Sequence, residues 1–391
     1  MHANKIAVVG AGIGGLAVAA GLLRHGIGCE IFEQAGRFGE AGAGVQIAPN
    51  AAKLLHRLGI AERIDRVATK PDAVEMRHWR DNRVIACTRL GAACAQRYGA
   101  PYYTFHRGDL HRVLLDLIPR AWIHIGHRCT GVSERDEVVT LHFSNGATWR
   151  GDLVIGADGV RSTVRAALIP DNPRFSGQAM YRGLVPADRL PHLAGPPRVR
   201  LWLGPNQHCV CYPVAKDLFS FGATVPAGDS TPENWTEPGR VEDLAAAYRG
   251  WHQDVQRIID VLDTVSRWAL HDRDPVTRWS SKRITLVGDA AHPMLPFMAQ
   301  GANQAIEDAF ALAKYLASPT STRILDSLAG YEQARVARTA EVQQISRNNG
   351  MLFHLPDDDA QRERDWVMSM KQELPNQAWL FGYDAELSAG T

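Results

Sequence analysis

The fold of this chain is decided by residues 5–34, KIAVVGAGIGGLAVAAGLLRHGIGCEIFEQ. Its first residues form a β-rich run, and the glycines that follow predict a turn. From Leu16 the apolar residues recur at helical spacing until Gly26, a residue type that commonly ends helices. A second β-rich run then ends at Gln34. We therefore predict a βαβ unit, the beginning of a parallel sheet.

The turn of this unit has the spacing Gly10-x-Gly12-x-x-Gly15, with Gly14 inside it and Glu33 at the end of the second strand. Gly10 permits a tight turn, Gly12 lets the backbone approach a diphosphate, and Gly15 lets helix and strand pack closely. The helix N-terminus adds free N–H groups and a positive dipole end. The pattern indicates dinucleotide binding, with Glu33 accepting from a ribose, although glycines that serve only the turn remain an alternative.

The composition limits the classes of function. The chain has 391 residues, enough for about two to three lobes, and 45% apolar with 22% charged residues is typical of a packed fold. A net charge of +1 argues against nucleic acid or an anionic membrane as a partner. Because glycines interrupt the apolar N-terminal run, we expect neither a signal peptide nor a membrane span. We therefore expect the protein to be cytoplasmic.

We expect no metal site and no disulfide framework. The six cysteines contain no CxxC pair, and the fifteen histidines contain no HExxH pattern. His292, beside Pro293, is interpreted as structural rather than catalytic.

Two further motifs lie far along the chain. Residues 152–165, DLVIGADGVRSTVR, and residues 283–293, RITLVGDAAHP, each predict a buried strand that ends in an acid beside a glycine. The acids are Asp158 and Asp289, and strand carboxyl ends are where open α/β sheets bind ligands. For either acid alone, a turn or helix cap is the alternative.

Taken in order, GAGIGG with Glu33, DGVRSTVR, and GDAAHPMLPFMAQGANQAIEDA (residues 288–309) resemble the single-component FAD-dependent aromatic hydroxylases, or class A flavoprotein monooxygenases. The resemblance covers nearly the whole chain. It is nearest to the salicylate, 3-hydroxybenzoate and 6-hydroxynicotinate hydroxylases. The stretches that carry this likeness are FGEAGAGVQIAPN, RYGAPYYTFHRGDLH, YRGLVP, NQHCVCYP and WLFGYD.

This resemblance implies bound FAD, NADH or NADPH as a transient reductant, and O2. The expected reaction is hydroxylation, with or without decarboxylation, of a small hydroxylated aromatic or pyridine acid. A flavin reductase or dehydrogenase on the same fold and a non-catalytic flavin or ligand binder are the rivals, because fold does not fix function. A homodimer is possible.

The expected fold is α/β, with a Rossmann-like FAD-binding domain, an inserted antiparallel-sheet substrate domain and a helical C-terminal tail. We expect residues 1–174 and 269–330 to form the FAD-binding domain, 175–268 the substrate domain, and 331–391 the tail. Asn145-Gly146 predicts a hairpin turn. Asn50 is placed to cap the helix that follows it.

The resemblance also implies the cofactor site. Asp289 would hold the ribityl chain, and Pro293 would lie over the flavin. The backbone at Gly301 and Ala302 would face the pyrimidine edge, where a helix N-terminus stabilises the negative charge of reduced flavin. The remaining implied cofactor residues are Gln34, Gln46 beside the ring, Arg107, Cys129, and Asp158 near the cofactor or nicotinamide.

The substrate side is predicted from QHCVCYPV. Alternate strand residues share a face, so His208 and Tyr212 point the same way with Cα atoms about 13 Å apart. By likeness they would accept or relay a phenolic proton; a structural pair is the alternative. Cys209 and Cys211 would face the other way and pack. Arg182 would bind a carboxylate or make a surface ion pair.

Two residues depart from the likened enzymes. Gln46 stands where the hydroxynicotinate type has histidine and matches the hydroxybenzoate type. Phe297 is apolar where those two types offer a histidine and an amide, respectively. The expected substrate pocket, which includes Phe297, therefore matches neither type.

Overall fold

A computed structural model describes residues 4–39, 43–135, 137–215, 217–228, 238–318, 323–371 and 373–388. Its first sheet is parallel and has the strand order β19-β12-β1-β2-β8. The bounds are β1 (Ile6–Val9), β2 (Glu30–Phe32), β8 (Ile123–His124), β12 (Leu153–Gly156) and β19 (Ile284–Leu286). Strands β1, β12 and β19 are buried throughout, as expected for a parallel sheet covered on both faces.

Helices cover this sheet. Helix α1 (Ile13–Arg24) follows the glycine turn and packs against α9 (Gly301–Leu316). The two helices approach closely at Gly21, where an added Cβ would lie 3.2 Å from the Ala313 side chain and 3.3 Å from the Ala309 carbonyl oxygen. The predicted βαβ unit and its parallel sheet are therefore confirmed.

The second sheet has eight strands in the order β17-β18-β13-β16-β15-β14-β5-β6. Its neighbouring strands run antiparallel except for β14 and β5. The bounds are β5 (Ala73–His78), β6 (Val84–Arg89), β13 (Arg174–Pro186), β14 (Arg198–Gly204), β15 (Gln207–Pro213), β16 (Leu218–Pro226), β17 (Pro238–Gly239) and β18 (Val265–Asp272). The predicted domain boundaries stay predictions.

One face of the second sheet is covered by α7 (Val241–Ala247) and α8 (Gln253–Asp260). Cys209 and Cys211 are fully buried in this layer with Tyr248 and Val255, which confirms that they pack. His208, Val210 and Tyr212 alternate with the two cysteines and therefore lie on the opposite face.

Two smaller sheets complete the strands, β9 (Cys129–Arg135) with β10 (Val138–Phe143) and β11 (Thr148–Gly151), and β3 (Gly44–Ile47) with β7 (Tyr103–His106) and β4 (Ala68–Thr69). The hairpin predicted at Asn145-Gly146 joins β10 to β11, with Gly146 at φ +82°. The other helices are α2 (Pro49–His56), α3 (Ala61–Val67), α4 (Gly91–Tyr98), α5 (Arg107–Leu115), α6 (Thr163–Ala166), α10 (Ile324–Phe353), α11 (Asp359–Lys371), α12 (Ala378–Phe381) and α13 (Ala385–Ser388).

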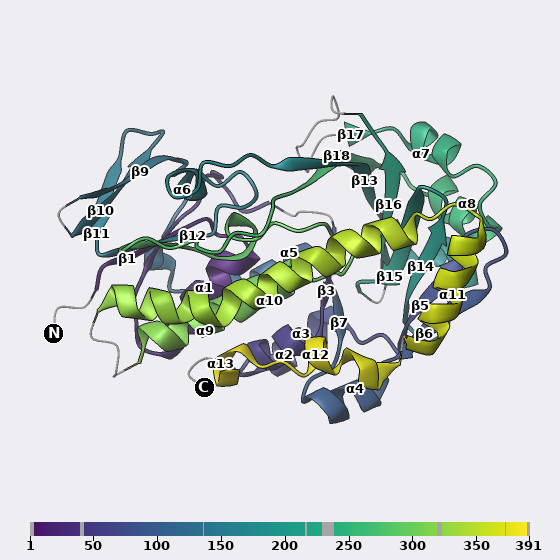
Figure 1. Ribbon diagram of the computed structural model, residues 1–391, viewed down its shortest axis with the longest axis horizontal. Helices are drawn as coiled ribbons and strands as arrows, with labels where there is room; N and C mark the ends of the chain where they lie inside the picture. The colour runs from purple at the N-terminus through teal and green to yellow at the C-terminus, as the bar shows by residue number, and fades with distance from the viewer. Residues whose placement is uncertain are drawn as a thin grey trace.

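Helix α10 runs along most of the long axis of the molecule, from the end near the parallel sheet to the eight-stranded sheet (Figure 1). The chain then returns through α11, α12 and α13 toward α2 and α9. No helix in the described part of the chain is long and apolar enough to cross a membrane.

The predicted cap at Asn50 is wrong. Helix α2 begins two residues earlier than predicted, at Pro49, with Ala48 at the cap position. The fully buried Asn50 amide instead donates to the side chains of Gln300 (3.1 Å) and Glu307 (2.6 Å). Its tertiary partners on α9 override the local capping preference.

Candidate active site

The glycine turn before α1 forms an open anion cradle. Gly10 has φ +104°, and its added Cβ would lie 2.4 Å from the Ala157 carbonyl oxygen. A Cβ on Gly15 would lie 2.0 Å from the Gly10 carbonyl oxygen, so both glycines are required by packing. A Cβ on Gly12, in contrast, would meet no atom within 4 Å among the described residues. The first helical bond is Leu16 N to Gly12 O, so the preceding N–H groups face this space without helical partners.

Glu33 closes one side of this cradle. Its carboxylate accepts from the backbone N–H of Ala11 and of Ala35, both at 2.8 Å. Gln34 is exposed beside it. Cys129 is buried, and burial raises the pKa of its thiol to about 11, so the thiol is neutral at physiological pH.

Helix α5 lines the next part of the site. His111 Nε2 lies 2.8 Å from the Ala11 carbonyl oxygen in the glycine turn. Burial lowers the pKa of the Arg107 guanidinium, while the nearby Asp289 carboxylate raises it. Sequence reasoning named Arg107 and missed His111, although their i,i+4 spacing on one predicted helix face was an available signal.

Asp289 and the start of α9 lie close together in a further part of the candidate cofactor site. A Cβ on Gly301 would lie 3.7 Å from Asp289 Oδ1. Burial raises the pKa of the Asp289 carboxyl, and the charges of His292 and Arg107 oppose that rise. Since the first helical bond here is Gln304 N to Gln300 O, the N–H groups of Gly301 and Ala302 have no partner within the helix.

The loop after Asp289 is held from two sides. Asp308 Oδ2 lies 2.6 Å from His292 Nε2, and the Pro293 carbonyl accepts from Gln343 Nε2 at 2.9 Å. His292 is 2% exposed and its Nδ1 has no partner among the described residues. An orphaned nitrogen beside Asp289 and the open space at Gly12 both fit a bound polar cofactor.

The Asp158 carboxylate caps helix α6, which is the alternative role that the sequence left open for this acid. Its carboxylate accepts from the Ser162 hydroxyl, Thr163 N (2.7 Å) and Val164 N (3.2 Å) at the start of α6. Its contact with the cofactor or nicotinamide stays a prediction. In the same motif, the buried Arg165 donates to the carbonyls of Ala290 and Ala291 at 3.0 and 2.6 Å, and so joins two motifs remote in sequence.

On the substrate side, Tyr212 lies against Gly44 of β3. A Cβ on Gly44 would lie 2.6 Å from both the Tyr212 hydroxyl and Ser220 Oγ, and Gly44 N donates to Ser220 Oγ at 3.0 Å. Burial raises the pKa of Tyr212, and the Arg182 charge and hydrogen bonds with Ser220 and Gln46 oppose that rise.

Gln46 and Arg182 lie next to this tyrosine. The Tyr102 hydroxyl donates to Gln46 Oε1 at 2.6 Å, while Arg182 Nη1 lies 3.4 Å from the Gly44 carbonyl oxygen and its guanidinium carbon lies 5.6 Å from the Trp268 ring centre. Sequence reasoning missed Ser220 and Tyr102. Ser220 lies opposite Tyr212 in the pairing of the consecutive strands β15 and β16, so their adjacent β-rich runs were an available signal, whereas Tyr102 precedes β7 and is remote in the chain.

His208 makes a separate cluster at the other end of the strand. Its Nδ1 lies 2.8 Å from His354 Nε2, and its ring packs edge-on against Phe297 and Phe353 at 5.1 and 5.3 Å. Burial lowers the pKa of His208 well below its usual value and that of His354 to about 4, so the pair is uncharged at neutral pH. Phe297 is thus brought to His208, whereas Gln46 and Arg182 are brought to Tyr212.

Comparisons with known proteins agree with this geometry. The chain belongs to the FAD-binding domain family, whose model matches residues 3–346. It is 49% identical over 385 residues to 3-amino-4-hydroxybenzoate 2-monooxygenase PtnB3 of Streptomyces platensis, covering 98% of this chain and 97% of that one. It is 37% identical over 390 residues to 6-hydroxynicotinate 3-monooxygenase of Pseudomonas fluorescens, covering 97% and 95%. Among solved structures, HpxO of Klebsiella pneumoniae in complex with FAD and uric acid superposes with a TM-score of 0.85 at 28% identity, covering 99% and 97%.

The protein is therefore an FAD-dependent aromatic monooxygenase that uses NAD(P)H and O2. The predicted family, fold class, cofactor and enzyme class are confirmed, and these findings do not fit the reductase and binder alternatives. FAD supplies the redox chemistry, and the protein binds, orients and shields the reactants.

Proposed function

We propose that this enzyme hydroxylates a benzoate that carries both an amino and a hydroxyl group, with 3-amino-4-hydroxybenzoate as the favoured substrate and ring carbon C2 as the position attacked. The observation that carries this proposal is the 49% identity to the Streptomyces enzyme of that name over almost all of both chains. Because C2 bears no carboxylate in this substrate, hydroxylation would proceed without decarboxylation.

The chemistry of the site supports this substrate class. An uncharged amino group donates electron density to the neighbouring ring carbon, and a buried site favours the uncharged form. Arg182 is half-buried beside Tyr212 and offers a cation for the carboxylate. Tyr212 and Gln46 offer hydroxyl and amide groups to the ring substituents. His208 then serves as the proton acceptor or relay at the other end, beside Phe297.

A pyridine acid such as 6-hydroxynicotinate is the second candidate, supported by the 37% identity to the Pseudomonas enzyme. Gln46 and Phe297 argue against it, because the 6-hydroxynicotinate enzyme type that this chain resembles has histidine at both positions. The benzoate is therefore favoured.

We propose the cofactor contacts on the geometry above. The diphosphate would bind at Gly12 and Gly14, the adenosine ribose at Glu33, and the ribityl chain at Asp289. The flavin ring would lie near Gln46 and Pro293. The other proposed cofactor residues are Gly10, Gly15, Gln34, Arg107, Cys129, Asp158, Gly301 and Ala302.

Substrate turnover tests the proposal. The FAD-loaded protein is given NADH or NADPH, 18O2, and in turn 3-amino-4-hydroxybenzoate, 6-hydroxynicotinate, 3-hydroxybenzoate and salicylate. We expect one 18O atom at C2 of the aminohydroxybenzoate with the carboxylate retained. Consumption of NAD(P)H that yields only hydrogen peroxide with this compound, while another acid is hydroxylated, would refute the substrate.

We also propose that the enzyme acts in the cytoplasm as a homodimer. The six free cysteines fit a reducing compartment, and Trp366 and Met370, one turn apart on α11, are 64% and 59% exposed and offer apolar surface to a second copy. Light scattering after gel filtration should give twice the monomer mass, and fractionation of the source cells should recover the enzyme with cytoplasmic markers.

A further inference from the structure

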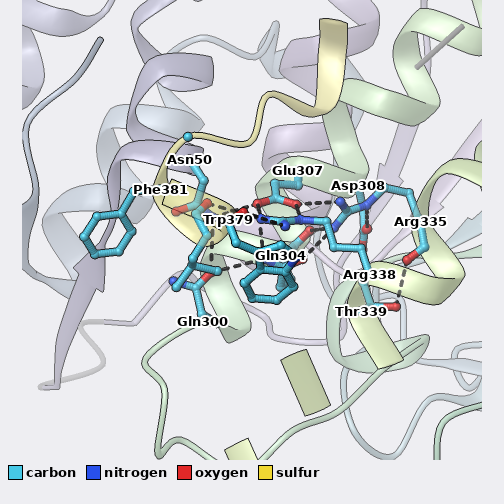
Figure 2. Close-up of polar contacts among 12 residues, drawn as sticks. Asn50, Gln300, Gln304, Glu307, Asp308, Arg335, Arg338, Thr339, Trp379 and Phe381 are labelled. Carbon is cyan, nitrogen blue, oxygen red and sulfur yellow. Dashed lines mark hydrogen bonds and ion pairs between the residues drawn. The ribbon is translucent and has the colours of Figure 1, made fainter. Parts of the chain in front are cut away.

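Two neighbouring acids on α9 are buried without access to water. Glu307 and Asp308 are both 0% exposed, and Arg335, also 0% exposed, pairs with both. The charges of such a pair are costly to bury unless each is matched by cations and hydrogen bonds. Figure 2 shows how the partners from several segments converge on the two carboxylates.

Asp308 is committed to the loop that carries Asp289. Its Oδ2 accepts from Gly288 N at 2.9 Å and lies 2.6 Å from His292 Nε2, while Oδ1 accepts from Arg335 Nε at 2.8 Å. Although burial raises the pKa of Asp308, His292 and Arg335 lower it to about 2, so the carboxylate stays charged.

Glu307 shares Arg335 with Asp308 and has further partners of its own. Arg338 donates to both of its oxygens, Nε to Oε2 at 2.7 Å and Nη2 to Oε1 at 2.9 Å. Asn50 Nδ2 and Gln304 Nε2 donate to Oε1 at 2.6 and 3.2 Å. The fork of Arg338 is therefore matched to a single carboxylate in the bidentate geometry that arginine favours.

The same two amides hold Gln300, the residue directly before α9. Gln300 Oε1 accepts from Asn50 Nδ2 and from Gln304 Nε2, both at 3.1 Å. Glu307 thus reaches Gln300 through two parallel links, and Gln300 precedes Gly301 and Ala302, whose N–H groups have no helical partner.

The C-terminal segment, residues 378–384, closes this network. Arg338 donates to the carbonyls of Trp379 and Leu380, both at 3.3 Å, and its guanidinium carbon lies 3.7 Å from the Tyr383 ring centre. Lys53 Nζ donates to the Phe381 carbonyl at 3.0 Å. The segment WLFGYD, which the cofactor and substrate assignments leave unused, therefore covers the Arg338–Glu307 pair.

We propose that Arg338 and Glu307 are positioning residues for the flavin: through Asn50 and Gln304 they hold Gln300, and with it the first turn of α9, against the cofactor. The inference rests on the proposed placement of Gly301 and Ala302 at the pyrimidine edge and is independent of the substrate. The N-terminal N–H groups of α9 stabilise the reduced, negatively charged flavin more than the oxidised form. A displaced first turn therefore weakens FAD binding and makes the midpoint potential of the bound flavin more negative.

Asn50→Ala and Arg338→Met test this without substrate. Each apoprotein is titrated with FAD, and the potential of the bound flavin is measured by spectroscopic redox titration. We expect the Kd for FAD to rise about tenfold, corresponding to one lost hydrogen bond of the stronger kind, and the potential to become more negative in both variants. Arg338→Lys keeps the positive charge but loses the bidentate guanidinium. Its flavin potential should therefore lie between those of Arg338→Met and the wild type.

Arg57→Met is the matched control. Arg57 pairs with Asp384, at the other end of the same segment, and with Glu386 just beyond it, and does not contact Glu307. It should leave the Kd and the potential unchanged. If Arg338→Met fails to fold, Asn50→Ala decides, since it leaves the Glu307–Arg338 pair intact. Wild-type Kd and potential in a folded Asn50→Ala protein would overturn the inference, and because no substrate is present the proposed benzoate would be unaffected.

Discussion

At the scale of single residues, Gly44 controls the space around Tyr212. The Tyr212 hydroxyl, Ser220 and the Arg182 guanidinium all approach the backbone of this glycine, and its missing side chain leaves the space that they occupy. Gly44 lies in the stretch FGEAGAGVQIAPN, and no individual role was predicted for it from the sequence. Its role follows from the crossing of β3 over β15 and β16.

Gly44→Ala should therefore uncouple the reaction. The new methyl carbon would lie 2.6 Å from the Tyr212 hydroxyl, so the tyrosine must move. We expect FAD content close to that of the wild type, and at least a tenfold fall in hydroxylated product per NAD(P)H consumed, which corresponds to about 1.4 kcal/mol. Product yield against NAD(P)H oxidation measures this. Gly39→Ala, at a site where an added Cβ meets nothing within 4 Å among described residues, is the control. Unchanged coupling in Gly44→Ala would exclude Tyr212 from the reaction.

At the scale of elements, the end of α10 is joined to strand β15. His354, the residue that follows α10, pairs with His208, and the His354 carbonyl accepts from Asn206 N at 2.9 Å. Gly350 on α10 lets Phe297 pack there, since an added Cβ would lie 2.8 Å from the Phe297 ring. Helix α10 therefore packs against Phe297, and His354 after it pairs with His208, two residues that we predict to line the substrate pocket.

This joint makes stability depend on pH in a defined window. Burial holds the pKa of His208 well below its usual value and that of His354 at about 4. In the unfolded chain both would titrate near about 6.5, so between these values the unfolded state binds more protons. Stability is thus full above about pH 6.5 and is lost as pH falls toward 4. His354→Gln, which cannot titrate, should flatten this fall in thermal midpoint.

The control for the pH dependence is His142→Gln, at an exposed position on β10. It should keep the slope of the wild type, because it leaves the His208–His354 pair in place. A His354→Gln protein whose midpoint falls as steeply as that of the wild type between pH 6.5 and 4.5 would show that the pair does not titrate in this window.

At the scale of the whole molecule, the candidate cofactor site is assembled from segments that are far apart in the chain. The glycine turn, α5, the loop at Asp289 and the start of α9 surround it, and α10 connects this region to the eight-stranded sheet (Figure 1). A ligand that touches so many segments stabilises the folded state over the unfolded one.

Removal of FAD should therefore lower the thermal midpoint. At a free FAD concentration of about 1,000 times Kd the gain in unfolding free energy is about 4 kcal/mol. Gly12→Val is the matched variant, because its side chain enters open space and so leaves the apoprotein intact while it fills the cradle. We expect equal apoprotein midpoints and an FAD-induced rise in the wild type alone. A full rise in Gly12→Val would place the diphosphate elsewhere.

The resemblance to class A flavoprotein monooxygenases implied the flavin cofactor and the monooxygenase class. The residues by themselves determined the βαβ unit and the faces of β15. These depend on local patterns: glycine spacing, strand alternation and motifs whose residues are adjacent in the chain. Sequence reasoning misjudged Asn50, because a capping preference of about 1 kcal/mol yields to buried hydrogen bonds with α9. Only the tertiary structure separated His208 with Phe297 from Tyr212 with Gln46, and enclosed Glu307 with Arg338. Those contacts join residues 31 to 166 positions apart, and their geometry is set by how the sheets and α10 pack rather than by any local pattern.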